Sequence, residues 1–220
     1  MRNAGGVLSA RQETEARIFV KTSKPIPAGL GFRVKSGWAM AVLLAGPSAA
    51  PKLIQCRAVL LCDPEIPQSK QPYHAALELP EKAAKAMAQK LTKVVRDATR
   101  KSVRELLKQA NELKYEVRGA GLVVGSLVDP ATLHNEHIRA HGLEGQLFRT
   151  ALADALLKHE IPCNVLLEKT AYATASLALR KSPADARRTI ASLGDAQEGS
   201  WRAEEKLAAL AAWMAICARR

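Results

Sequence analysis

The sequence predicts an α/β fold in which three antiparallel strands are followed by alternating helices and parallel strands. Two observations support this prediction. Three β-prone runs follow one another with only short links, which favours an antiparallel meander. Two later apolar runs alternate with segments of helical periodicity, which is typical of parallel strands joined by helices. The expected result is a mixed five-stranded sheet with flanking helices.

The first three strands are expected over Leu30–Lys35, Trp38–Leu44 and Lys52–Leu61. Lys35-Ser36-Gly37 is a tight-turn signal between the first two strands, and Gly46-Pro47-Ser48 interrupts the chain before the third. Each strand is therefore bounded by residues that favour turns.

A proline-rich loop over residues 63–72 precedes a long helix, Glu81–Leu113. Pro80 stands just before this helix, where proline is tolerated because the first helical amides have no partner. The remaining elements are expected to alternate. They are strands over Gly121–Val128 and Pro162–Leu167, and helices over Leu143–His159, Thr170–Leu179, from Ser182–Pro183 onward, and over Glu204–Ala218.

The length of 220 residues suits one domain, which we place at residues 29–220. Residues 1–28 are predicted to form a basic, flexible amino-terminal arm, because they carry five basic and two acidic residues and a glycine pair. The start of the chain lacks an apolar signal segment, and the longest apolar run is far too short to span a bilayer. Four scattered cysteines without a CxxC pair indicate buried thiols, so we expect a cytoplasmic protein without membrane contact.

The charge balance is the most unusual part of the composition. Lys and Arg number 33 against 21 Asp and Glu, a formal net charge of +12. This excess favours a polyanionic partner such as nucleic acid, whereas an aromatic content of only 4% argues against a stacking platform for single strands. Five cations recur at helical spacing in the long helix and are predicted to contact phosphates, although a solvated face with i,i+4 pairing would give the same pattern. They are Lys93, Arg96, Arg100, Arg104 and Lys108.

Four short segments of the second half carry a family resemblance. They are Gly121-Leu-Val-Val-Gly-Ser-Leu, Gly142-Leu-Glu-Gly145 at a helix start, Ile161-Pro-Cys-Asn-Val-Leu-Leu-Glu168, and Glu205-Lys-Leu-Ala-Ala-Leu210 in the last helix. In this order the chain resembles the RuvC/YqgF-like group of Holliday junction resolvases and rRNA-maturation nucleases. The resemblance covers roughly residues 29–218 and implies an RNase H-like fold.

The resemblance also implies a metal-dependent nuclease, in which carboxylates hold Mg²⁺ or Mn²⁺ for phosphodiester cleavage. Glu168 and Glu205 match two of the family's acidic positions, with Glu204 as a one-residue alternative. The first position departs from the pattern, because Arg33 stands where the family has an aspartate, and Lys35 follows two residues later. We expect Arg33 to pair with Glu168 or Glu205, so that the protein binds no metal cofactor and its cleavage activity is impaired. Arg33 and Lys35 are also expected to contact nucleic acid.

A histidine-rich segment offers a second arrangement. His134, His137 and His141 follow the fourth strand, with Asp129 just before them. Imidazoles bind transition metals, so a rebuilt metal site from Asp129, His134, His137, Glu168 and Glu205 is an alternative. In the other interpretation these histidines contact solvent, backbone or phosphate, and Gly142 disfavours one unbroken helix through all three.

Three functions are therefore weighed. The first is a nucleic-acid-binding protein with a degenerate RuvC/YqgF-like fold that no longer cuts, and the sequence favours this one. The second is a Mg²⁺- or Mn²⁺-dependent, structure-selective nuclease that uses Glu168, Glu205 and Asp129. The third is a scaffold or assembly subunit, with a homodimer left open.

Overall fold

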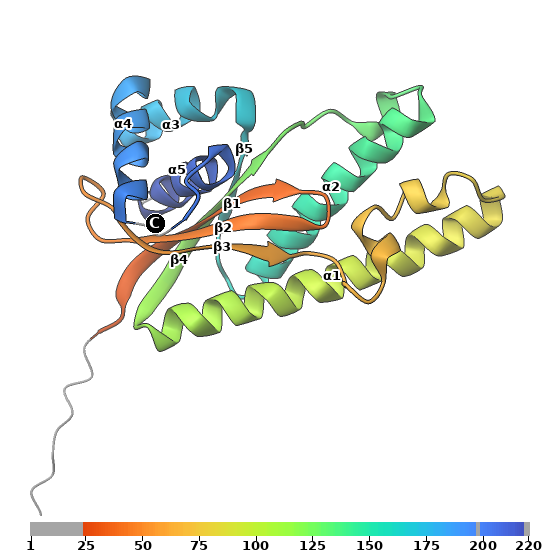
Figure 1. The fold of residues 1–220 in the computed structure, drawn as a ribbon, viewed down its shortest axis with the longest axis horizontal. Helices are drawn as coiled ribbons and strands as arrows, with labels where there is room; N and C mark the ends of the chain where they lie inside the picture. Colours follow the sequence, from red (N-terminus) through yellow and green to blue (C-terminus); the bar gives the residue numbers. More distant parts are fainter. Residues whose placement is uncertain (1–23, 197–198, 218–220) are drawn as a thin grey trace, which may run out of the picture.

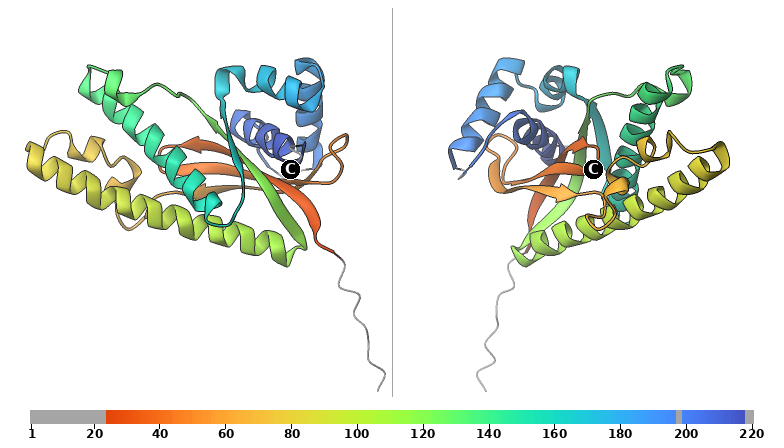
Figure 2. Two further views of the ribbon diagram at one scale, coloured as in Figure 1. Left: turned by 180° about the vertical axis from the view of Figure 1, so that it is seen from behind. Right: turned by 45° about the vertical axis from the view of Figure 1, so that its right-hand side comes forward.

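The computed structural model describes residues 24–196 and 199–217, which form a mixed five-stranded sheet with helices on both faces (Figures 1 and 2). Within the sheet the strands follow the order β3-β2-β1-β4-β5. β1 pairs with β2 and β2 with β3 in antiparallel fashion, whereas β1–β4 and β4–β5 are parallel. This confirms the predicted fold class. The strands are β1 (Ile26–Lys35), β2 (Trp38–Ala45), β3 (Lys52–Leu60), β4 (Tyr115–Val124) and β5 (Cys163–Leu167).

The described part of the chain also contains five α-helices and several single 3₁₀ turns; two of the helices lie between strands and three follow the last strand. The 3₁₀ turn η2 (His74–Ala76) lies in the loop before α1, and η3 (Pro130–Thr132) and η4 (Glu168–Thr170) follow β4 and β5. None of the described helices is both long and apolar enough to cross a bilayer. The helices are α1 (Glu81–Glu112), α2 (Glu136–Leu157), α3 (Ala171–Leu179), α4 (Pro183–Leu193) and α5 (Ala203–Cys217).

Three predicted elements begin several residues earlier than expected, and the first of them is β1, which begins at Ile26 instead of Leu30. The fourth strand was expected at Gly121–Val128, but β4 begins at Tyr115 and ends at Val124. Its first half alternates exposed and partly buried residues beside β1, so it lacks the continuous apolar run on which the prediction relied. The helix expected from Leu143 begins at Glu136 instead, where Asn135 caps it by accepting the amide hydrogen of Ile138.

One face of the sheet is covered by α5, with α3 and α4 outside it, and the other by α1 and α2. α5 packs unusually close because glycines of β1 and β4 face it. A Cβ on Gly31 would lie 1.9 Å from the carbonyl oxygen of Ala208, and one on Gly29 would lie 2.3 Å from that of Ala212. α5 therefore runs antiparallel to β1, and its amino terminus lies at the carboxyl end of β1.

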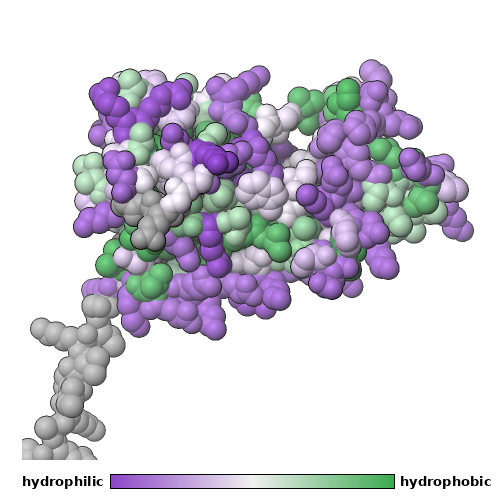
Figure 3. Space-filling view, in the orientation of Figure 1, coloured by the Kyte–Doolittle hydropathy of each residue, from purple (hydrophilic) through white to green (hydrophobic). Residues whose placement is uncertain are grey.

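The long helix α1 buries one side and exposes the other. Its interior side consists of Leu91, Val95, Thr99, Val103, Leu106 and Ala110. Lys93, Arg96 and Arg104 lie outside that side and are exposed. Figure 3 shows hydrophilic side chains along the lower edge of the molecule, where Figure 1 places α1.

The amino-terminal arm expected over residues 1–28 falls largely outside the described residues. Of its last residues, Ile26–Ala28 already belong to β1, and the Ile26 amide donates a hydrogen bond to the Lys114 carbonyl oxygen at 2.8 Å. The cysteines, expected to be buried, are each only partly buried.

Candidate functional site

The carboxyl ends of β1, β4 and β5 meet at one edge of the sheet because these three strands are parallel. The amino terminus of α5 lies at the same edge. Arg33 and Lys35 come from the end of β1, Glu168 follows β5, and Glu204 lies in the first turn of α5. We call these four residues the charged edge.

Arg33 is the most deeply buried member of the charged edge, with 4% of its surface exposed. One guanidinium nitrogen, Nη1, donates to the Val34 carbonyl oxygen at 2.8 Å, and the other, Nη2, donates to the Glu168 carboxylate. The Glu168 side chain is 41% exposed. The cation is therefore withdrawn from water and depends on Glu168 for its counter-charge, whereas Glu168 keeps access to solvent.

Lys35 and Glu204 form a second ion pair, with 3.3 Å between Nζ and Oε1. The pKa of Glu204 is lowered, chiefly because its own backbone amide donates to the carboxylate. Burial acts in the opposite direction, and the hydrogen bond and charge of Lys35 and the charge of Arg33 lower the pKa further. Of the two adjacent acids, Glu204 is thus the one that faces the cations.

Of the two predicted alternatives in the last helix, the structure places Glu204 beside the cations and Glu205 away from them. Glu205 is 8% exposed, and its carboxylate accepts the backbone amide hydrogen of Arg202 at 2.9 Å. This is the reach-back contact by which a glutamate in the first turn satisfies an amide at a helix start. Glu205 stabilises the start of α5 and does not face Arg33.

The remaining predicted ligands do not assemble with Glu168. Asp129 accepts the Ala131 amide hydrogen at 3.0 Å and caps η3, and the exposed His134 lies before the start of α2. Within residues 24–196 and 199–217, the acids and histidines of the rebuilt metal site do not form a ligand group. At the charged edge one carboxylate oxygen of each acid is engaged by a cation, Glu168 Oε2 by Arg33 and Glu204 Oε1 by Lys35.

A different histidine group does form. His74 on η2 meets His137 and His141 on α2, with ring centroids 4.2–4.7 Å apart. α2 continues through Gly142 and contains His137 and His141, but His134 lies before its start, so no single helix runs through all three histidines of the segment, as expected. A Cβ on Gly142 would lie 3.1 Å from the Leu133 side chain. Sequence reasoning missed His74 because it lies just after the proline-rich loop, far along the chain from the other two.

The cations of α1 divide into paired and unpaired residues. Arg100 pairs with Asp97 at 2.9 Å, and Lys108 approaches Glu112 at 3.8 Å. The other three, Lys93, Arg96 and Arg104, form no ion pair with the described residues, and they are exposed. Acids of the same helix therefore neutralise only two of the five cations of the predicted basic face.

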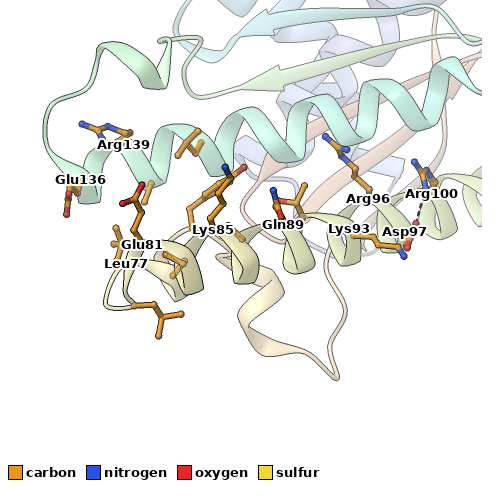
Figure 4. A pocket seen from close by; sticks show the side chains of 18 residues that line it. Leu77, Glu81, Lys85, Gln89, Lys93, Arg96, Asp97, Arg100, Glu136 and Arg139 are labelled. Atoms are coloured by element: carbon orange, nitrogen blue, oxygen red, sulfur yellow. Dashed lines mark hydrogen bonds and ion pairs between the residues drawn. The ribbon is translucent and has the colours of Figure 1, made fainter.

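Three of these cations also line a groove of about 930 Å³ between α1 and α2 (Figure 4). Lys93, Arg96 and Arg100 stand along its α1 wall, and Arg139 lies on its α2 wall. Apolar side chains fill much of the remaining lining, namely Tyr73, Ala76, Leu77, Leu79, Ala84, Ala88, Ala140 and Leu143. We call this the α1–α2 groove.

No protein-family model matches the sequence, and no curated protein matches it either. Solved structures do match. Thermus thermophilus RuvC in complex with Holliday junction substrate is similar over 86% of this chain and 91% of that chain, with 10% identity and a TM-score of 0.50. A second structure of Thermus thermophilus RuvC is similar over 86% of this chain and 92% of that chain, with 11% identity and a TM-score of 0.49. The yeast mitochondrial Holliday junction resolvase Ydc2 is similar over 88% of this chain and 79% of that chain, with 12% identity and a TM-score of 0.42.

The strand order, the parallel and antiparallel pairing and the likeness to the junction-bound RuvC structure define an RNase H-like, RuvC-like fold. The resemblance drawn from the four sequence segments is confirmed at the level of the fold.

Proposed function

We propose that this protein binds nucleic acid through the outer face of α1 and the adjoining α1–α2 groove, and that its charged edge does not cleave the bound chain. The observation that carries the proposal is the row of exposed cations Lys93, Arg96 and Arg104, which have no ion-pair partner among the described residues. The similar RuvC structure is a complex with Holliday junction substrate, so branched DNA is the first ligand to test.

The row has dimensions that suit a phosphate backbone. Lys93 and Arg104 lie 11 residues apart on one helix, which at a rise of about 1.5 Å per residue corresponds to roughly 17 Å. Cations along such a line can contact several phosphates of one strand. Contacts of this kind supply affinity without reading the base sequence, and they make binding depend strongly on salt.

The absence of cleavage is argued from the charged edge. Metal-dependent cleavage needs carboxylates that are free to hold the ions that activate water and stabilise the leaving oxygen. Here Arg33 is buried against Glu168, and Lys35 lies beside Glu204. By resemblance, Arg33 occupies the position of the family's first aspartate. A cation at that position repels a metal ion and engages the neighbouring acid.

Binding is tested by fluorescence anisotropy with a four-way DNA junction, duplex DNA and structured RNA over a range of salt concentrations. The variant Lys93→Gln/Arg96→Gln/Arg104→Gln removes the row. The control Lys169→Gln/Arg180→Gln/Arg188→Gln removes the same charge from exposed residues around α3 and α4. We expect the first variant to bind more weakly and the salt slope to decrease by about 0.9 for each duplex phosphate that the protein no longer neutralises.

The control should bind like the wild type, apart from a small effect of net charge. Equal affinities and equal salt slopes for the two triple variants would contradict the proposed surface.

Cleavage is tested with the same junction in Mg²⁺ and in Mn²⁺. We expect no cleavage above that of a Glu168→Gln/Glu204→Gln variant. Cleavage by the wild type that disappears in that variant would refute the non-cleaving part of the proposal and support the nuclease alternative.

A further inference from the structure

Three histidines from two separate segments converge beside the α1–α2 groove. His137 and His141 lie one turn apart on α2, and His74 is brought to them by η2. One ring nitrogen of each histidine lies within 4.8 Å of the others. We propose that His74, His137 and His141 form a binding site for one divalent transition-metal ion of the zinc class. This site is separate from the charged edge, and the inference does not depend on the proposed function.

Glu144 orients the first of these ligands. It is fully buried on α2, and its Oε1 atom accepts two hydrogen bonds from His74, from the ring Nδ1 at 2.9 Å and from the backbone amide at 3.2 Å. An ionised carboxylate only accepts, so an ionised Glu144 selects the tautomer with the ring proton on Nδ1 and the lone pair on Nε2. A carboxylate behind a histidine in this way is how proteins fix the orientation of metal-binding imidazoles and raise their basicity.

The far nitrogen of His74 supports the same conclusion. His74 Nε2 is buried and has no hydrogen-bond partner. A buried polar atom normally has a partner, and an exception calls for an explanation such as an ion. Its nearest ring neighbours are His137 and His141, and both are exposed. The unpartnered Nε2 atom of His74 therefore lies beside two further imidazoles, those of His137 and His141, that can bind the same ion.

The charge of Glu144 is also left incompletely balanced. Its Oε2 atom is buried without a hydrogen-bond partner, and no Lys or Arg among the described residues pairs with it. A buried carboxylate is costly unless positive charge lies nearby. A divalent ion bound to His74 would supply that charge one imidazole ring away. Simple ring packing at the surface would not explain why a carboxylate is buried behind the histidines.

The donor set selects the class of metal. Three neutral imidazoles suit Zn²⁺, Ni²⁺, Cu²⁺ or Co²⁺, whereas Mg²⁺ and Ca²⁺ prefer oxygen ligands. Zinc–nitrogen bonds measure about 2.0–2.1 Å, so the rings must draw closer, and the exposed His137 and His141 can do so by side-chain rotation. The bound ion would fasten η2 to α2. Because Tyr73 and Ala76 at η2 line the α1–α2 groove, the ion would stiffen one wall of it.

The test uses the full chain without a polyhistidine tag, stripped with EDTA and titrated calorimetrically with Zn²⁺ alone. We expect one equivalent to bind and the melting temperature to rise. Co²⁺ should give the visible bands of a nitrogen-ligated ion without sulfur charge-transfer absorption, which separates this site from the cysteines. Glu144→Gln should weaken binding about 10–100-fold, as loss of a carboxylate behind a ligand typically does.

The variant His137→Ala/His141→Ala removes two exposed ligands, so its fold should survive, and circular dichroism checks this. It should abolish the single Zn²⁺ equivalent. The matched control His134→Ala/His159→Ala removes two exposed histidines outside the group and should bind Zn²⁺ like the wild type. The proposal is overturned if the wild type binds no Zn²⁺, Co²⁺ or Ni²⁺ at micromolar concentrations. It is equally overturned if binding persists in the His137→Ala/His141→Ala variant.

Discussion

Replacing Glu168 by glutamine should destabilise the protein more than replacing Arg33 by methionine, although both changes remove the same ion pair. The asymmetry comes from burial. The Arg33 side chain is 5% exposed and that of Glu168 is 41% exposed. Glu168→Gln leaves a buried guanidinium without its counter-charge, whereas Arg33→Met leaves a carboxylate that water can reach and puts an apolar side chain in the interior.

The magnitude follows from two limits. Breaking a fully buried pair by removing one partner costs about 3–5 kcal/mol, and exposed pairs contribute about 0.2–1 kcal/mol. The half-exposed Glu168 places Glu168→Gln between these limits, at about 2 kcal/mol. Arg33→Met should stay within about 1 kcal/mol of the wild type, because apolar replacement of a buried ion is often neutral. For a chain of this size, about 2 kcal/mol corresponds to a fall in Tm of roughly 4–8 °C.

The assay is urea unfolding followed by circular dichroism, with the midpoint compared at an unchanged slope. Glu204→Gln serves as the control, because its pair with Lys35 is about one-third exposed on both sides and should contribute little. The reasoning is refuted if Arg33→Met destabilises as much as Glu168→Gln, or if Glu168→Gln has no more effect than Glu204→Gln.

Three further predictions concern packing and titration. Gly31→Ala should lower the free energy of unfolding by about 3 kcal/mol or more, because its Cβ would lie 1.9 Å from an α5 carbonyl oxygen. Gly145→Ala on α2 meets open space and should raise the free energy of unfolding by up to about 1 kcal/mol. Urea unfolding measures both changes. The lowered pKa of Glu204 means that its contribution to stability is complete above the ordinary value of 4.5 and lost as the pH falls through the lowered value. Glu204→Gln removes this titrating group and should slightly flatten the acid side of a Tm–pH profile, and a steeper profile would contradict this. Burial raises the pKa of the Cys163 thiol to about 12. Cys163 should therefore react with iodoacetamide at neutral pH more slowly than Cys62 and Cys217, as mass spectrometry of labelled peptides can show.

The order of elements could be predicted because it depends on local patterns. The Lys35-Ser36-Gly37 turn, the proline before α1 and the Ser182 cap of α4 each act within a few residues of their own position, and the structure confirms them. The start of β4 could not be predicted in this way. Its first residues are held by pairing with β1, a partner distant in sequence.

The site shows the same division. The sequence by itself determined that a cation, Arg33, ends the first strand and that an acid, Glu168, follows the fifth, and the parallel topology brings them together. Whether Glu204 or Glu205 faces the cations was decided only by the tertiary structure, because the backbone amide of Arg202 donates a hydrogen bond to the Glu205 carboxylate.

The histidine group depended on tertiary structure even more. His74 carries no local signal of its role, and its position beside His137 arises from the packing of η2 against α2 over the buried Glu144. Local sequence therefore determined the elements and the charge that each presents. The pairing of distant side chains was decided by packing, because contact between separate segments depends on the sheet and helices that hold them.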